Sequence, residues 1–225
     1  MTSSKLRLLS AFALALGIGG VTACSAADTE NARPEVRASG QAVAAFYGDS
    51  YTRGMGASDP SRRWSTVISE DRGWAEFNPS VDGLGFVNNR QFLDNDLVDL
   101  IVAEEPDILI VTMGLNDNFS MPSRSVDIEA AITEDLETFA NELPETRLVV
   151  VEPFWYTDER TSSVDTIINW VENAAQTVDA DYIPGASHWL EGHPEWMADD
   201  GIHPNDQGYA EIAARMGNAL SDLGL

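Results

Sequence analysis

The sequence predicts a single α/β domain of three layers, in which helices cover both faces of a central, mostly parallel sheet. Short apolar runs alternate along the chain with longer segments that carry apolar residues at helical spacing. No internal repeat or second domain boundary interrupts this alternation, and 44% hydrophobic with 22% charged residues is an ordinary globular composition. Alternating strands and helices are typical of βαβ units, whose crossovers place helices on both faces of the sheet.

Uninterrupted apolar runs predict the buried strands of this sheet. They are residues 41–47, residues 107–113 and residues 148–151, and the first two end before a glycine. Strands that are buried on both faces read as continuous apolar runs rather than as alternating patterns. A weaker, strand-like segment covers residues 77–81.

Helices are predicted where apolar residues recur with the period of a helix. These segments are residues 64–68, 95–103, 127–143, 164–178 and 206–223. The second segment stops shortly before Pro106, which cannot continue a helix. Residues 127–143 and 164–178 flank the predicted strand of residues 148–151.

The N-terminus predicts a secretory signal peptide over residues 1–23. Lys5 and Arg7 precede an uncharged apolar stretch, residues 8–20. This stretch is too short for a comfortable transmembrane span, which needs about 20 residues. The protein is therefore expected to be exported.

The end of the signal resembles the bacterial lipobox, in which cleavage precedes a cysteine that receives lipid on its sulfur. It reads Val21-Thr22-Ala23-Cys24, and Cys24 is the only cysteine. The expectation is a protein anchored through Cys24 to the outer face of the bacterial cytoplasmic membrane or to the cell envelope, and the alternative is an ordinary signal peptide with an incidental cysteine. Residues 24–40 are small, polar and charged, which predicts a flexible tether before the domain of residues 41–225.

Charge and cysteine content exclude several classes of function. The formal net charge of −24 argues against a nucleic-acid partner bound by neutralisation of phosphates. The same charge disfavours anionic substrates and anionic membrane surfaces, except through the lipid itself. A single cysteine excludes an internal disulfide framework and a cysteine-based zinc site.

Polar residues follow the predicted strands at the edge where a parallel sheet binds ligands, outside the carboxyl ends of its strands. They are Gly48-Asp49-Ser50 and Gly114-Leu115-Asn116-Asp117, and the loop before the last predicted helix adds Asp200-Gly201-Ile202-His203. A serine nucleophile needs a base such as histidine, and a carboxylate fixes the tautomer of that histidine. Each segment alone has a structural alternative, a helix cap or a turn, and only their combination favours a catalytic site. No G-x-S-x-G pattern surrounds Ser50, which counts against the nucleophile elbow of an α/β-hydrolase.

Together with Gly83, these segments resemble the four sequence blocks of the SGNH (GDSL-type) hydrolase family. The blocks occur in the family's order from Gly48 to His203, and Tyr51 stands where the family name has leucine. The second block is the loosest match, because Gly85 is an alternative to Gly83. Gly83 is preferred since it follows the strand-like residues 77–81.

The resemblance implies a role for each of these residues. Ser50 would be the nucleophile, His203 the base and then the acid, and Asp200 the group that orients His203. The backbone N–H groups of Ser50 and Gly83 and the side-chain amide of Asn116 would bind the oxyanion. The family uses no cofactor, and the sequence offers no metal site, since the two other histidines lack the spacing of metal ligands.

The predicted function is that of an extracytoplasmic serine ester hydrolase acting on acylated glycans, glycolipids or small esters. Arg53, Trp155 and Trp189 are candidate substrate-binding residues, with packing within the loops as the alternative. Two further functions stay open: an acyltransferase using the same triad, and a surface lipoprotein that binds glycan or protein without turnover.

Overall fold

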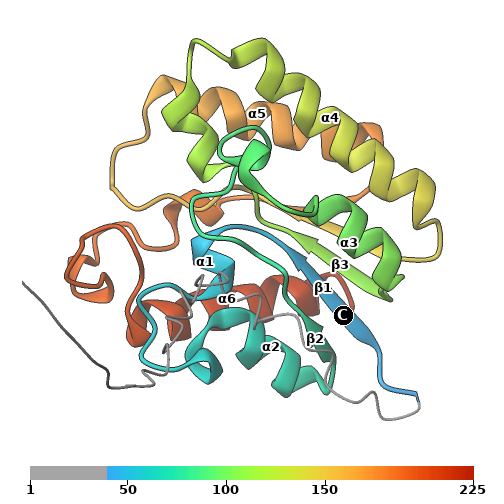
Figure 1. The fold of residues 1–225 in the computed structure, drawn as a ribbon. Coiled ribbons are helices and arrows are strands. Elements are labelled where there is room, and N and C mark those ends of the chain that lie inside the picture. Colours follow the sequence, from blue (N-terminus) through green and yellow to red (C-terminus); the bar gives the residue numbers. More distant parts are fainter. Residues whose placement is uncertain (1–39) are drawn as a thin grey trace, which may run out of the picture.

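The computed structural model describes residues 40–225, which are arranged around five parallel strands (Figure 1). The strands are β1 (Val43–Tyr47), β2 (Ala75–Phe77), β3 (Ile108–Val111), β4 (Arg147–Val151) and β5 (Asp181–Ile183). Their order in the sheet is β2-β1-β3-β4-β5, and all neighbouring pairs are parallel. The predictions of a signal peptide, of lipidation at Cys24 and of a tether lie outside the described residues.

Helices cover both faces of this sheet, which confirms the predicted α/β fold class (Figure 1). One face carries α2 (Trp64–Arg72) and α6 (Asp206–Asp222), and the other carries α3 (Leu97–Glu104), α4 (Ser125–Glu142) and α5 (Ser162–Thr177). The segment after β1 forms the short α1 (Ser50–Arg53). Short 3-10 helices cover Pro60–Arg62, Arg90–Phe92, Leu115–Ser120, Ala186–His188 and Pro194–Trp196.

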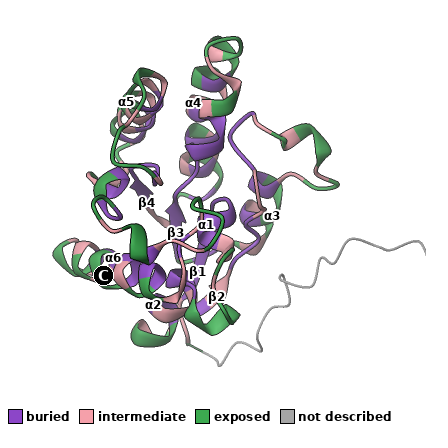
Figure 2. Ribbon diagram, turned by 90° about the vertical axis from the view of Figure 1, so that its left-hand side faces the viewer, coloured by how far each residue is buried: buried purple, intermediate pink, exposed green. Residues whose placement is uncertain are grey.

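The core consists of two apolar clusters separated by the sheet. Successive side chains of a strand point to opposite faces. Ala44 and Phe46 of β1 accordingly belong to the cluster under α2 and α6, whereas Ala45 and Tyr47 belong to the cluster under α3, α4 and α5. Figure 2 shows the central strands as mostly buried. Burial on both faces explains why β1, β3 and β4 appear in the sequence as continuous apolar runs.

The strand-like interpretation of residues 77–81 is wrong. β2 ends at Phe77, and the Asn78 side chain accepts a hydrogen bond from the Ser80 N–H, which turns the chain. Pro79 has no N–H to donate to a neighbouring strand. β5 was not predicted, because it is three residues long and only Ile183 of it is fully buried.

No helix within residues 40–225 is long and apolar enough to cross a membrane.

Candidate active site

Ser50 is the first residue of α1, which begins almost directly after β1. Asp49 caps this helix by accepting a hydrogen bond from the Tyr51 N–H at 3.0 Å. Gly48 makes the tight turn possible, because a Cβ at this position would lie 2.4 Å from the Thr52 Oγ1 atom. The strand-to-helix turn thus places the Ser50 side chain at the carboxyl end of the sheet, where it is 5% exposed.

Asp200 and His203 lie in the loop that precedes α6. The loop is closed by antiparallel pairing of Met197 with Pro204, and the Ala198 N–H donates to the His203 carbonyl at 2.8 Å. One oxygen of Asp200 accepts the backbone N–H groups of both Ile202 and His203 at 2.9 Å. These bonds fix the carboxylate relative to the backbone of His203.

Ser50, His203 and Asp200 form a continuous hydrogen-bonded chain across two loops that are 153 residues apart in sequence. The His203 Nε2 atom lies 3.0 Å from Ser50 Oγ, and the Nδ1 atom lies 2.7 Å from Asp200 Oδ2. The hydrogen bond from His203 lowers the pKa of Asp200 to about 2, assisted by the backbone N–H groups. Asp200 is therefore ionised at neutral pH and accepts the Nδ1 proton, which leaves Nε2 to face the serine hydroxyl.

The two loops are also tied to each other by residues outside this chain. The Tyr51 hydroxyl donates to the carbonyl of Ile202 at 2.5 Å, and the Tyr209 hydroxyl donates to the carbonyl of Met55 at 2.7 Å. Tyr51 is fully buried and its ring stacks on Phe154. The Ser50–His203 distance is thus set by packed side chains on both sides.

Within residues 40–225, the backbone N–H groups of Ser50 and Gly83 donate to no backbone carbonyl. Gly83 has a φ of +72°, a left-handed conformation that favours glycine. The N–H of Gly85, in contrast, already donates to the Asn88 carbonyl at 2.9 Å. The geometry therefore favours Gly83 over Gly85 as a donor to a bound anion. The residues before Gly83 are a turn rather than the expected strand, because β2 ends at Phe77.

The side chain of Asn116 joins the nucleophile loop to the segment that contains Gly83. Asn116 lies in the 3-10 helix after β3 and is 8% exposed. Its Nδ2 atom donates to Asp49 Oδ2 at 3.0 Å and to the Leu84 carbonyl at 2.9 Å. The predicted oxyanion residues Ser50, Gly83 and Asn116 are thus brought together by three separate loops.

The sequence comparisons agree with this geometry. Residues 46–211 match the model of the GDSL-like lipase/acylhydrolase family. The chain belongs to this family. The matched segment contains the four blocks from Gly48 to His203.

Individual relatives of this GDSL-like hydrolase are distant. A GDSL lipase of Mycobacterium tuberculosis is 26% identical over 121 residues, which cover 53% of this chain and 52% of that lipase. The chain thus spans about half the length of the curated relative that it matches. The psychrotrophic esterase EstA of a Pseudoalteromonas species has a TM-score of 0.63 at 14% identity, covering 81% of this chain and 98% of the esterase. The acetylxylan esterase Axe2 of Geobacillus stearothermophilus has a TM-score of 0.59 at 16% identity, covering 79% and 93%. At such identities these structures show a shared fold.

Asp49 is a buried acid that the sequence analysis treated only as part of a motif. It is 1% exposed, and burial raises its pKa to about 7. The Tyr51 N–H opposes this rise, whereas the nearby carboxylates of Asp117 and Asp82 add to it. No sequence signal beyond its place before Ser50 distinguishes Asp49 from an exposed helix cap.

The candidate substrate-binding residues are divided by the structure. Arg53 lies one turn after Ser50, pairs with Asp82 at 2.6 Å and lines a cavity of about 220 Å³ together with Met55. Trp155 and Trp189 are 4% and 9% exposed and belong to the apolar core. Their burial favours the packing alternative for both tryptophans, and leaves Arg53 beside the site.

Within the described residues, no group of three or more His, Cys, Asp or Glu side chains is arranged to hold a metal ion. His188 instead contacts Glu191 at 2.6 Å, and His193 contacts Glu195 at 2.8 Å. His193 also stacks on the ring of Trp196, with ring centroids 3.5 Å apart.

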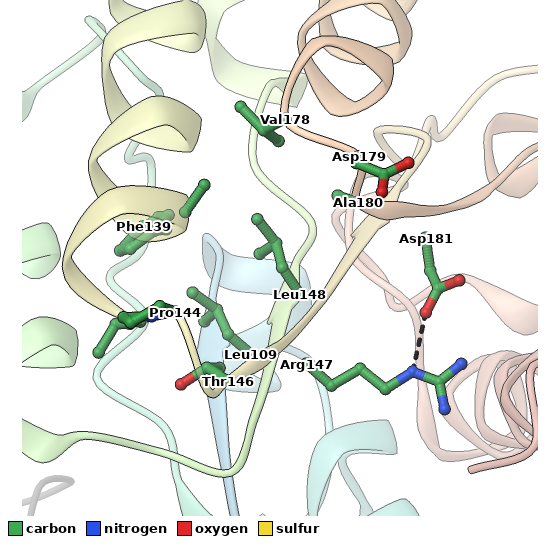
Figure 3. A pocket seen from close by; sticks show the side chains of 12 residues that line it. Leu109, Phe139, Pro144, Thr146, Arg147, Leu148, Val178, Asp179, Ala180 and Asp181 are labelled. Atoms are coloured by element: carbon green, nitrogen blue, oxygen red, sulfur yellow. Dashed lines mark hydrogen bonds and ion pairs between the residues drawn. The ribbon is translucent and has the colours of Figure 1, made fainter.

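A second cavity, of about 300 Å³, lies at the amino ends of β3, β4 and β5 (Figure 3). Ser50 lies beyond the carboxyl end of β1, at the other end of these parallel strands. Leu109, Phe139 and Leu148 form an apolar wall. Arg147 and Asp181 pair beside it at 2.9 Å. None of the candidate catalytic residues lines this cavity.

Proposed function

We propose that this family member is an extracytoplasmic serine ester hydrolase in which Ser50, His203 and Asp200 form the catalytic triad. The observation that carries the proposal is the hydrogen-bonded chain from Ser50 Oγ to His203 Nε2 and from His203 Nδ1 to Asp200. A serine hydroxyl is a weak nucleophile unless a base removes its proton during attack. His203 is placed for this transfer, and ionised Asp200 stabilises the imidazolium that results.

The reaction proceeds in two halves. Ser50 Oγ attacks the carbonyl carbon of the ester while its proton moves to His203 Nε2, and the carbonyl oxygen becomes an oxyanion. Collapse of this intermediate breaks the bond to the alcohol, which leaves with the proton from His203, and the acyl group stays on Ser50. Water then attacks the acyl-enzyme with His203 again as the base, which releases the acid and restores the serine.

The oxyanion is bound by the N–H groups of Ser50 and Gly83 and by the Asn116 amide. Because both Nδ2 hydrogens of Asn116 are already engaged, the oxyanion shares one of them in a three-centre bond. Neutral donors that are already in place stabilise charge as it develops, without reorganisation at the moment of reaction.

The proposed substrates are uncharged esters: acylated glycans, glycolipids or small esters outside the cytoplasm. Three observations support this class. The signal and lipobox pattern of residues 1–24 points to export and anchoring, and the net charge of −24 repels anionic esters. A structural neighbour is described as an acetylxylan esterase, which acts on an acylated glycan.

Turnover of 4-nitrophenyl acetate by wild type and by Ser50→Ala tests the function. We expect Ser50→Ala to lose nearly all turnover and all labelling by a fluorophosphonate probe, while Ser123→Ala, at an exposed serine, keeps both. Equal turnover by Ser50→Ala would exclude Ser50 as the nucleophile. A wild type that folds but neither turns over the ester nor reacts with the probe would favour the binding lipoprotein instead.

The acyltransferase alternative is tested by the same ester with an added sugar acceptor. A hydrolase releases acetate at an unchanged yield, whereas a transferase forms acetylated sugar at the expense of acetate. Predominant sugar acetylation at millimolar acceptor would replace the hydrolase assignment.

A further inference from the structure

Asp117 is a buried carboxylate next to Asn116 in sequence, and the proposed mechanism does not use it. Its side chain is fully buried. It accepts three successive backbone N–H groups: Phe86 at 2.7 Å, and Val87 and Asn88 at 2.9 and 3.1 Å. Hydrogen bonds to an ionised acceptor are about twice as strong as neutral ones, so this turn is held firmly on the carboxylate.

Gly85 is the residue that lets Asp117 approach this turn. A Cβ at position 85 would lie 2.5 Å from Asp117 Oδ2, closer than atoms approach without displacement. The Gly85 N–H also closes the turn by donating to Asn88. This accounts for the second glycine of the Gly83-Leu84-Gly85 segment, which contributes no donor to the oxyanion.

The turn held by Asp117 is continuous with the oxyanion donors. The side-chain amides of Asn88 and Asn89 both donate to the Gly83 carbonyl at 2.9 Å. The Leu84 carbonyl accepts from Asn116 Nδ2. Movement of residues 86–88 would therefore displace Gly83. It would also displace the Leu84 carbonyl, which accepts the hydrogen bond from the Asn116 amide.

We propose that Asp117 is a positioning residue: its carboxylate fixes residues 83–88 and thereby aligns the Gly83 N–H and the Asn116 amide for the oxyanion. The proposal rests on the proposed function, since it assigns Asp117 to the same oxyanion site. Burial raises the pKa of Asp117, and the three N–H groups oppose that rise. Burying an acid costs free energy. The described side-chain hydrogen bonds of Asp117 all join it to residues 86–88, and none joins it to the proposed triad.

The variant Asp117→Asn tests this role. Both carboxylate oxygens of Asp117 accept N–H groups, whereas an asparagine side chain has one oxygen that accepts and a nitrogen that cannot. We expect kcat for 4-nitrophenyl acetate to fall about 10- to 100-fold, less than the 10²–10³-fold that removal of one oxyanion donor costs. KM should stay within about twofold, because the contacts are made to the transition state.

Glu152→Gln is the matched control. Glu152 is also a buried carboxylate, 8% exposed, and it accepts the N–H groups of Gly185 and Ser187 in a loop that holds no proposed catalytic residue. We expect Glu152→Gln to lower the melting temperature but to leave kcat unchanged. A folded Asp117→Asn protein with wild-type kcat would overturn the proposal.

A double variant separates a positioning role from a general loss of structure. If Asp117 acts through the oxyanion donors, Asn116→Ala combined with Asp117→Asn should lose less activity than the product of the two single losses. Fully multiplicative losses would overturn the proposal.

Gly85→Ala and hydrogen exchange keep the idea testable if Asp117→Asn does not fold. Gly85→Ala displaces the carboxylate while retaining it, and should give the same loss of kcat at nearly constant KM. In the wild type, the amides of residues 86–88 should be protected from deuterium exchange, and exchange at the rate of an open loop would overturn the proposal. Failure of the proposed function is seen separately, as unchanged turnover in Ser50→Ala.

Discussion

The raised pKa of Asp49 makes a quantitative prediction about stability. Burial moves this pKa from its usual value of 3.8 to about 7 in the folded protein, so the native state holds the proton more tightly than the unfolded chain. Stability falls with pH wherever the native state binds more protons. The contribution of Asp49 to the free energy of unfolding should therefore be most favourable below about pH 4, fall as the pH rises to about 7, and then level off.

The size of this effect follows from the two pKa values. Each pH unit between them is worth about 1.4 kcal/mol, which gives a loss on the order of 4 kcal/mol between pH 4 and pH 7. Asp49→Asn has nothing to titrate there, and its amide oxygen still accepts the Tyr51 N–H. Its stability relative to wild type should therefore increase across this range. Asp49→Asn should also lower the free energy of unfolding by an amount that does not change with pH. The N–H group of the new amide would face the Asn116 amide, which is itself a donor at this contact.

Urea unfolding of wild type and Asp49→Asn, followed by tryptophan fluorescence from pH 4 to pH 8, measures this difference. Titration of the other carboxylates cancels in the comparison, and Asp127→Asn, at an exposed carboxylate of α4, controls for the loss of one charge. A difference between wild type and Asp49→Asn that stays flat from pH 4 to pH 7 would refute the reasoning, because Asp49 would then be ionised in the folded state throughout.

Three further predictions concern the site and the N-terminus. Asn116→Ala should lower kcat by about 10²–10³-fold with little change in KM, and a change in KM alone would make Asn116 a substrate-binding residue. Asp200→Asn should lower kcat by about 10²–10⁴-fold through loss of the charge beside His203. Because the pKa of Asp200 is about 2, its own titration should add no acid limb to the wild-type pH–rate profile above about pH 4. Wild type should fractionate with membranes, whereas Cys24→Ala should be released or retained unprocessed, and processed variant in the membrane fraction would contradict the lipobox interpretation.

The strands that are buried on both faces of the sheet were predictable from the sequence. β1, β3 and β4 are central strands with helices on both faces, so almost every position of each is apolar. β2 and β5 are the edge strands, and they are short and partly polar. Edge strands bury fewer positions than central ones, so their bounds depend on tertiary contacts rather than on a local pattern.

The convergence of the candidate site residues was predictable for a related reason. Parallel strands deliver the loops after their carboxyl ends to one edge of the sheet, so Ser50, Asn116 and His203 are brought together by topology. The positions of Trp155 and Trp189 were not predictable in this way. An aromatic residue in a loop after a strand can face solvent or fold back onto the core. Its position depends on packing partners such as Phe154, whose ring centroid lies 5.8 Å from that of Trp189.

The distinction between Gly83 and Gly85 depends on where buried carboxylates lie, which no local pattern records. The proposed oxyanion would form beside two acids, Asp49 and Asp117, and an ionised acid there would oppose the developing negative charge. Three backbone N–H groups compensate Asp117, and Gly85 allows them to approach. Because the pKa of Asp49 is about 7, its protonated fraction is about half at pH 7 and rises below it. A neutral amide at position 116 suits this environment better than a cation. A lysine or arginine there would pair with the nearest carboxylate and be held away from the oxyanion, whereas Asn116 donates without adding a positive charge that would lower the pKa of Asp49.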